Sequence, residues 1–496
     1  MNATSSAPPA SGPFWRRGLL LFLAVLALSV PQAALLPLLD RDEPRFAEAS
    51  REMLQSGNFI VPTFNHAPRY AKPPLIYWCQ AAAYTLLGEN AFAARLPSLL
   101  ATAATALLLM TWGWRLGREQ TGAGAGLLYA FCFQTVQQGR VATADALLIF
   151  FMTLTAFAGW MILRPKVPGR VHGACFLVLA LGVAGGFLAK GPEALLPFAP
   201  LLWCARGAGR NVITGLIVSF LAGLALVLLW AIPAYIESHG DYVNQGLREG
   251  VWDRIFSGLQ GHGSSSLFWY LLGVPLYYPL LFWLSALPWS PLLVIHRKKL
   301  FAAWKPDLTD SYLLLNAALI FIIFSLMVTK LPHSTLPAFP FLALCFARRW
   351  ESVALPKCTL TQLGWITGLA FALLTAILVP IAIANHATPS PVGELVREAG
   401  ATLTPDTQFA LVDFQEPNAI WEMRRVVKGY GQTIPQSEIL ASLSRPGPCA
   451  ILLTSALWQQ IELNSNFSQP PWKLFHARGF NAAKGSFVDL TLVVKP

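Results

Sequence analysis

Two acids and four basic residues from distant parts of this sequence have side chains that could act together on a phosphate. They are Asp42, Lys72, Asp145, Lys190, Arg254 and Lys330. Cations neutralise charge that develops on a bound phosphate, and a carboxylate can orient or deprotonate an attacking hydroxyl group. Such a set suits an anionic lipid head group whose phosphate is bound and made a leaving group.

Asp42 opens a short charged segment. One interpretation has Asp42 capping a helix that starts at Pro44, with Glu43 in the positive end of that helix. The other interpretation has Asp42 facing a cavity. Spacings of three and four residues also allow ion pairing along this interfacial helix, among Arg45, Glu48, Arg51 and Glu52.

Lys72 and Asp145 each have a structural and a functional interpretation. Lys72 precedes Pro73 and Pro74, and it either snorkels to lipid head groups or points rigidly at a phosphate. Asp145 precedes an apolar run and would be costly facing lipid, so we expect it to pair inside the protein, with Arg140 as the nearest candidate. That pair is either structural or part of a site.

Composition restricts the class of protein that can position these residues. The chain has 496 residues, 55% hydrophobic and only 12% charged, with a mean hydropathy of +0.51. This is an integral membrane protein, because an ordinary soluble core cannot bury so much apolar surface. The net charge of +11 sits in short loops, which excludes the basic stripe of a nucleic-acid-binding protein. The seven cysteines are scattered, which argues against a zinc site or a disulfide framework.

Apolar runs predict about eleven transmembrane helices, within a range of 11–13. They lie near residues 17–39, 92–114, 120–138, 144–163, 172–189, 192–205, 211–233, 267–295, 311–329, 334–347 and 360–384. The first run is too long for a secretory signal and has no cleavage site. With the N-terminus in the cytoplasm, every loop assigned to the inside is basic. The same topology brings all six candidate residues to the outer face.

Lys190 and Lys330 are basic residues on the outer side of the membrane, where the positive-inside rule disfavours lysine and arginine. Lys190 lies at a Gly-Pro corner, and this favours a functional role over snorkelling. His333, close to Lys330, is by itself more often structural than a ligand. The charges of the outer loop alternate in sign at Arg248, Glu249, Asp253 and Arg254. This loop is therefore either a salt-bridged helix face or part of the site.

The tail, residues 387–496, has a different composition. Strand-like runs at 409–414, 450–457 and 487–494 alternate with helix-like stretches. These features predict a small soluble α/β domain outside the membrane.

Several motifs resemble one known family. Asp42-Glu-Pro-Arg45-Phe-Ala-Glu48, the segment 52–62, Tyr70-Ala-Lys72-Pro-Pro, Asp145, Ala189-Lys190-Gly-Pro192 and Lys330-Leu-Pro-His333 occur in the order found in the aminoarabinose transferase (ArnT) branch of the protein O-mannosyltransferase-like glycosyltransferases. The resemblance covers about residues 15–350 and is most specific in the first eighty.

The resemblance implies an all-α polytopic membrane protein of GT-C type with a small C-terminal soluble α/β domain. The transmembrane glycosyltransferase domain would be residues 1–386, with outer juxtamembrane helices at about 40–90, and the periplasmic domain residues 387–496. The implied catalytic residues are Asp42 and Asp145, and the implied donor-phosphate cations are Lys72, Lys190, Arg254 and Arg45. Candidate substrate contacts are Tyr70, Glu249, Lys330 and His333.

Three positions depart from the family pattern. Ala71 stands where an acid is frequent, Glu249 where a histidine is, and Ser334 where a tyrosine is common. In aminoarabinose transferases that acid and histidine can hold a metal. Because Ala71 removes one ligand, no metal site is assigned and a divalent metal stays an open alternative, as does the identity of the sugar.

The leading hypothesis is an inner-membrane glycosyltransferase that takes a sugar from a polyprenyl phosphate, typically undecaprenyl phosphate. The acceptor would be lipid A or another envelope glycan or lipid, on the periplasmic side. One alternative is a transporter or flippase for a lipid-linked anion, which would place polar residues at the bilayer midplane in two related halves. The other is an O-antigen-type ligase.

Overall fold

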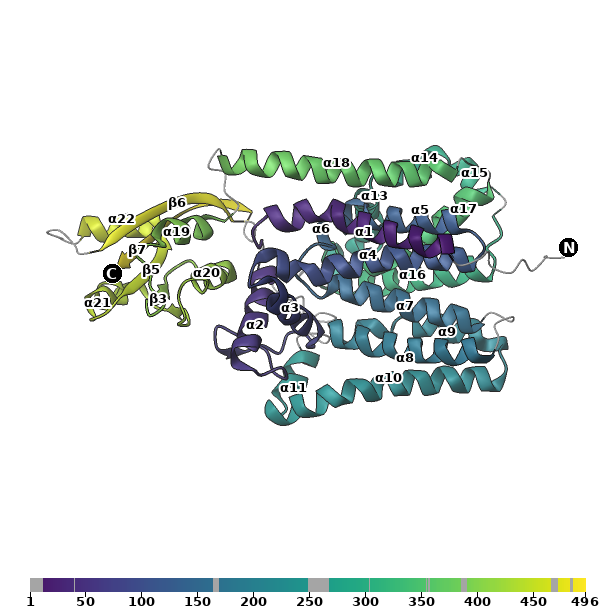
Figure 1. Cartoon of the computed structure of the whole chain (residues 1–496), viewed down its shortest axis with the longest axis horizontal. Coiled ribbons are helices and arrows are strands. Elements are labelled where there is room, and N and C mark those ends of the chain that lie inside the picture. Colours follow the sequence, from purple (N-terminus) through teal and green to yellow (C-terminus); the bar gives the residue numbers. More distant parts are fainter. Residues whose placement is uncertain are drawn as a thin grey trace. The chain divides into compact units, whose positions relative to one another are not determined.

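The structure is a computed structural model that describes residues 12–39, 41–163, 169–248, 267–302, 304–353, 355, 357–384, 390–464, 472–481 and 485–496. The chain divides into two compact units, each built from separate stretches of sequence (Figure 1). Unit 1 comprises Met1–Val30, Tyr70–Ile76 and Arg95–Ala372, and unit 2 comprises Pro31–Arg69, Tyr77–Ala94 and Leu373–Pro496.

Unit 1 is helical. Its helices are α5 (Glu119–Ala130), α6 (Phe133–Gln138), α7 (Asp145–Leu163), α8 (Gly169–Lys190), α9 (Phe198–Cys204), α10 (Arg210–Glu237), α11 (Asp241–Leu247), α13 (Leu267–Ser285), α14 (Ser290–Ile295), α15 (Arg297–Phe301), α16 (Leu308–Leu326) and α17 (Phe339–Ser352). Short 3-10 helices are η1 (Pro192–Leu195), η2 (Ala205–Gly207) and η5 (Leu336–Ala338). Three further helices have residues in both units, α1 (Gly12–Leu35), α4 (Ala91–Arg115) and α18 (Lys357–Ala384).

Seven helices in the described part of the chain are long and apolar enough to cross a membrane. They are Phe14–Leu35, Ala91–Arg115, Asp145–Leu163, Gly173–Lys190, Arg210–Glu237, Leu308–Leu326 and Thr359–Ile381. Each falls on one of the eleven predicted runs.

The other four predicted runs form shorter or interrupted helices. Run 120–138 is divided into α5 and α6, and run 267–295 into α13 and α14, with Pro288 between them. Proline lacks the N–H that a continuing helix needs, so it favours the second break. Runs 192–205 and 334–347 each begin with a 3-10 helix, η1 and η5.

Small residues let neighbouring helices of unit 1 approach closely. Gly113 of α4 faces Gly122 of α5, and a Cβ added to Gly122 would lie 2.8 Å from the Gly113 Cα and from the Leu109 carbonyl oxygen. Glycine at this crossing allows backbone-to-backbone contact, as is common between membrane helices. Large side chains fill the adjacent core, including Trp112, Tyr312 and Trp350.

Unit 2 contains a five-stranded mixed sheet of order β4-β3-β5-β7-β6. Its strands are β3 (Gln408–Leu411), β4 (Gln432–Thr433), β5 (Cys449–Thr454), β6 (Lys473–Asn481) and β7 (Ser486–Lys495). Strand β3 pairs in parallel with β4 and β5, whereas β7 pairs antiparallel with β5 and β6.

Helices cover both faces of this sheet. Alternate residues of β5 point to opposite sides, with Ala450 and Leu452 in one apolar cluster and Ile451 and Leu453 in the other. The first cluster includes side chains of α19 (Pro391–Ala399) and α20 (Pro417–Met423), and the second includes those of α21 (Ile439–Ser444) and α22 (Ser455–Asn464). Burial on both sides explains the continuous apolar sequence of β5.

Unit 2 also contains α2 (Asp42–Ser56), the small hairpin β1 (Thr63–Phe64) and β2 (Ala67–Pro68), the 3-10 helix η6 (Gln436–Glu438) and most of α3 (Leu75–Leu87). Helix α2 ends at Gly57, whose φ of 71° is in the left-handed region and whose N–H donates to the Met53 carbonyl at 3.1 Å.

Candidate active site

A charged cluster in unit 1 surrounds the ammonium group of Lys190. This residue ends α8, and Gly191 follows with a φ of 89°, which turns the chain into η1. Lys190 Nζ lies 2.8 Å from Asp145 Oδ1 at the start of α7 and 3.2 Å from Glu193 Oε2 on η1. Thr143 Oγ1 donates to the other oxygen of Asp145 at 2.9 Å. One buried ammonium is therefore held between two carboxylates.

His333 also interacts electrostatically with Asp145. The structure thus brings together three of the residues predicted from the sequence, Asp145, Lys190 and His333, and adds Glu193. The expected partner of Asp145 was wrong, because the carboxylate pairs with Lys190 and the Arg140 guanidinium donates to the Val136 carbonyl and to Gln137. Arg140 was nearest in sequence, whereas the corner between α8 and η1 brings Lys190 nearest in space.

Tyr70 and Lys72 pack against α11. The Tyr242 hydroxyl donates a hydrogen bond to the Lys72 carbonyl, and the rings of Tyr70 and Tyr242 lie 5.2 Å apart. The pKa of the Tyr70 phenol is raised by burial and by the nearby acids Asp241 and Glu237. Helix α11 leads toward the segment that contains Glu249 and Arg254, two predicted site residues that lie outside the described residues.

Lys330 stabilises the end of α16. Its Nζ donates to the carbonyls of Phe324 at 3.2 Å, Met327 at 2.6 Å and Ser325. These contacts satisfy the last carbonyls of the helix, a common role for lysine at a C-terminus. Burial lowers the pKa of Lys330 to about 8. These bonds give it a structural task that the sequence did not indicate.

In unit 2, Asp42 is the first residue of α2, and Arg41 occupies the N-cap position. The predicted cap at Asp42 with a helix start at Pro44 was therefore wrong. The Arg41 cap makes no side-chain hydrogen bond to the helix, and Glu43 Oε2 instead accepts the Leu39 N–H at 2.8 Å, which ties the preceding segment to the first turn. Asp42 itself remains 61% exposed, and its Oδ1 lies 4.0 Å from Arg45 Nη1.

Three arginines create a positive environment around this helix start. Burial lowers the pKa of Arg45, and the neighbouring guanidinium groups of Arg69 and Arg41 lower it further, while Asp42 acts in the opposite direction. Arg69 also donates to the Tyr77 hydroxyl at 3.2 Å. An exposed carboxylate beside clustered cations is a suitable environment for an acceptor hydroxyl and a phosphate.

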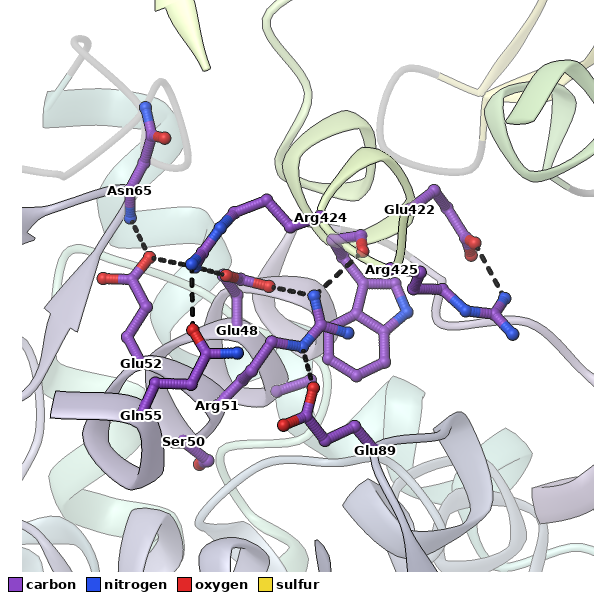
Figure 2. A network of polar contacts seen from close by, with 12 residues as sticks. Glu48, Ser50, Arg51, Glu52, Gln55, Asn65, Glu89, Glu422, Arg424 and Arg425 are labelled. Atoms are coloured by element: carbon purple, nitrogen blue, oxygen red, sulfur yellow. Dashed lines mark hydrogen bonds and ion pairs between the residues drawn. The ribbon is translucent and has the colours of Figure 1, made fainter. Parts of the chain in front are cut away.

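The same helix carries a buried ionic network toward its C-terminal half (Figure 2). Arg51 pairs with Glu48 at 2.8 Å and with Glu89 at 2.9 Å, and its guanidinium lies 3.8 Å from the Trp421 ring centroid. Arg424, which follows α20, pairs with both Glu48 and Glu52. Further hydrogen bonds join Gln55 to Arg424 and the Asn65 backbone N–H to Glu52. The network joins α2 to α20.

Sequence spacing found only part of this network. The i, i+3 pair of Arg51 with Glu48 was expected on an interfacial helix, but both side chains are fully buried. The contribution of Arg424 comes from the distant tail, and no local pattern could have identified it. Glu193 had a visible signal, because it lies three residues after Lys190 on the far side of the Gly-Pro corner.

No group of three or more His, Cys, Asp or Glu side chains within the described ranges could hold a metal ion. Ala71 offers no side-chain ligand atom at the position where the family resemblance implies an acid. The residues present thus do not supply that acid and histidine, and no chemical step is assigned to a metal.

Comparison with known proteins shows what this chain is similar to. Residues 15–246 match the sequence profile of dolichyl-phosphate-mannose-protein mannosyltransferase. The chain is 29% identical over 379 residues to an undecaprenyl phosphate-alpha-4-amino-4-deoxy-L-arabinose arabinosyl transferase of Enterobacter sp. (strain 638), covering 73% of this chain and 66% of that protein. It is 32% identical over 342 residues to the Pseudomonas aeruginosa (strain LESB58) protein of the same name, covering 65% and 59%. The chain thus spans less than two thirds of the length of these relatives.

A solved structure shares the fold over nearly the whole chain. ArnT from Cupriavidus metallidurans, bound to undecaprenyl phosphate, superposes with a TM-score of 0.72 over 97% of this chain and 98% of that one, at 16% identity. The structure of the same protein in its apo state superposes with a TM-score of 0.71. The predicted GT-C fold is thereby confirmed.

Proposed function

We propose that the protein is an inner-membrane glycosyltransferase using a polyprenyl-phosphate-linked sugar, because residues 15–246 match the sequence profile of dolichyl-phosphate-mannose-protein mannosyltransferase. The acceptor is lipid A or another lipid or glycan of the cell envelope. The observation that carries the proposal is the exposed Asp42 carboxylate beside Arg45, with Arg41 and Arg69 close by, in a chain with the ArnT fold.

The proposed reaction is a displacement at the anomeric carbon of the sugar. Asp42 orients the acceptor hydroxyl and takes its proton as the new carbon–oxygen bond forms. The bond from the anomeric carbon to the phosphate breaks, and the electron pair leaves with polyprenyl phosphate. Lys72, Lys190, Arg254 and Arg45 are the proposed cations for that phosphate, and Asp145 is the proposed second carboxylate. Tyr70, Glu249, Lys330 and His333 remain proposed substrate contacts.

The proposed topology has the N-terminus in the cytoplasm and the active site in the periplasm. The basic residues of the predicted inner loops support this orientation. Eleven crossings require the four interrupted segments α5–α6, η1–α9, α13–α14 and η5–α17 to span the bilayer together with the seven longer helices. Residues 387–496 would then be a periplasmic α/β domain, and the mixed sheet β3–β7 supports this proposal.

The sugar is proposed to be 4-amino-4-deoxy-L-arabinose or a close analogue, because the curated relatives named above transfer that sugar by name. Ala71 and Glu249 depart from the residues frequent in those enzymes. A panel of polyprenyl-phosphate donors, assayed with lipid A in proteoliposomes, would identify the sugar.

The substitution Asp42→Asn tests the assignment. It should abolish transfer in proteoliposomes while thermal unfolding stays unchanged, since the side chain is largely exposed. Glu43→Gln is the matched control, because the amide oxygen can still accept the Leu39 N–H, and it should retain activity. A fully active Asp42→Asn protein would overturn the proposal.

A further inference from the structure

Unit 1 contains an apolar cavity that sugar transfer does not explain. Its volume is about 220 Å³, and its lining includes Cys132, Phe282, Trp289, Phe301, Phe346 and Arg349. Apolar cavities of about 150 Å³ already bind a molecule the size of benzene. This cavity therefore has room for a segment of hydrocarbon chain.

One face of α17 gives the cavity its length. Phe339, Leu342, Ala343, Phe346 and Arg349 all line it, at spacings of three, four, seven and ten residues from the first. Ten residues of α-helix rise about 15 Å, which is about half of the hydrocarbon thickness of a bilayer. The cavity thus follows the depth of a single leaflet.

A basic turn lies at the Arg349 end of this row. The Arg349 guanidinium donates to the carbonyls of Leu300 at 2.5 Å and Ala302 at 3.0 Å, and to Ser352 Oγ at 3.1 Å. These partners are neutral, so they do not compensate its charge. Helix α15, whose Leu300 carbonyl accepts from Arg349, adds the exposed side chains of Arg297, Lys298 and Lys299.

Exposed apolar side chains flank the same turn. Ile295 is 68% exposed and Phe301 is 58% exposed. Apolar and basic side chains on two adjoining short helices, α14 and α15, are typical of a segment at the membrane interface. Basic pockets between membrane helices at that depth bind the head groups of anionic lipids.

We propose that this cavity binds one acyl chain of an anionic phospholipid, whose head group lies against Arg349 and the basic turn 297–299. The positive charge at the mouth decides between occupants. The far end of a polyprenyl chain is uncharged and would gain nothing from these residues, whereas a phosphodiester head group would. The proposal is independent of the proposed sugar transfer.

Native mass spectrometry of the purified full-length protein tests the proposal. After exchange into mixed micelles of phosphatidylglycerol and phosphatidylethanolamine, the protein should retain phosphatidylglycerol preferentially. Ala343→Phe should lower this retention about tenfold, because the ring displaces at least two methylene groups of the chain. Ala222→Phe on the exposed face of α10 is the matched control and should leave retention unchanged. Equal retention in both variants would overturn the proposal.

A charge variant tests the head group. Replacing Arg297, Lys298 and Lys299 together by glutamine should remove the preference for phosphatidylglycerol. A preference that stays at the wild-type level would overturn the assignment of the head-group site.

Cross-linking of the unmodified protein avoids any dependence on the folding of variants. Phosphatidylglycerol with a photoreactive diazirine at the end of one acyl chain should label α17 or α13 at the cavity. Excess phosphatidylglycerol should compete, and undecaprenyl phosphate should not. Competition by undecaprenyl phosphate alone, or labelling confined to α10, would contradict the proposal.

Discussion

Lys190 Nζ at the end of α8 lies 2.8 Å from Asp145 Oδ1 at the start of α7, although the two residues are 45 positions apart in the sequence. Glu193 Oε2 approaches the same ammonium at 3.2 Å. The two carboxylates fix the direction of the Lys190 ammonium group. In the proposed reaction, a donor phosphate bound by Lys190 must compete with at least one of these carboxylates.

Lys190→Met should destabilise the protein by about 3 kcal/mol, because it leaves two partly buried carboxylates without their counter-charge. Sugar transfer should also be lost. The triple substitution Lys190→Met, Asp145→Asn, Glu193→Gln also removes the two negative charges that Lys190→Met leaves uncompensated. It should therefore recover most of the unfolding temperature. Transfer should remain absent in the triple variant, which lacks both the proposed phosphate-binding Lys190 and the proposed second carboxylate, Asp145. Recovered activity would show that the cluster is only structural.

Lys330→Met should destabilise the protein by about 1–2 kcal/mol, because three carbonyls at the end of α16 lose a charged donor. The unfolding temperature in detergent measures this loss. If the helix-end role is its main one, the KM for the polyprenyl donor stays near the wild-type value. A large rise in KM with an unchanged unfolding temperature would instead support the substrate contact proposed for Lys330.

Gly122→Ala should destabilise unit 1 by roughly 2–3 kcal/mol. The added Cβ would lie 2.8 Å from the Gly113 Cα and the Leu109 carbonyl oxygen, both of them backbone atoms that cannot rotate away. Gly173→Ala is the matched control, since Gly173 lies within α8 and nothing lies within 4 Å of its added Cβ. The control should be neutral or slightly stabilising, because alanine is the better helix former. Equal unfolding temperatures for the two variants would contradict the close crossing.

The long apolar helices could be predicted from the sequence because bilayer thickness imposes their length. The interruptions could not, since the run 120–138 contains no proline and no charged residue and still divides between Ala130 and Phe133. Pro288 was a visible signal for the second break, but hydropathy outweighed it in defining a single run from 267 to 295.

Pairing partners were harder to predict than positions. Asp145 and Lys190 were both recognised as candidates, yet sequence distance favoured Arg140 as the partner of Asp145. The contact of Arg424 with Glu48 joins residues 376 positions apart, and neither periodicity nor motif relates them. The tertiary fold alone brings such pairs together.

Glu48 should make the stability of unit 2 decrease as pH rises. Burial raises the pKa of its carboxyl to about 7, although Arg51 and Arg424 act in the opposite direction. The network also contains more acids than bases, with Glu48, Glu52 and Glu89 around Arg51 and Arg424. Between the unfolded pKa of about 4.5 and the folded value, the native state binds a proton that the unfolded chain does not. This contribution to stability is therefore complete below pH 4.5 and is lost as pH rises through 7.

Glu48→Gln should flatten that dependence, because glutamine is neutral at every pH and keeps an oxygen that can accept from Arg424. Thermal unfolding of both proteins between pH 5 and 8 measures the effect, with the wild-type midpoint falling more steeply than that of the variant. Glu394→Gln on α19 is a suitable control, because that acid is paired only loosely, at 4.0 Å from the exposed Arg397, and should leave the wild-type slope intact. Parallel slopes for wild type and Glu48→Gln would mean that Glu48 stays ionised in the folded protein, held by Arg424.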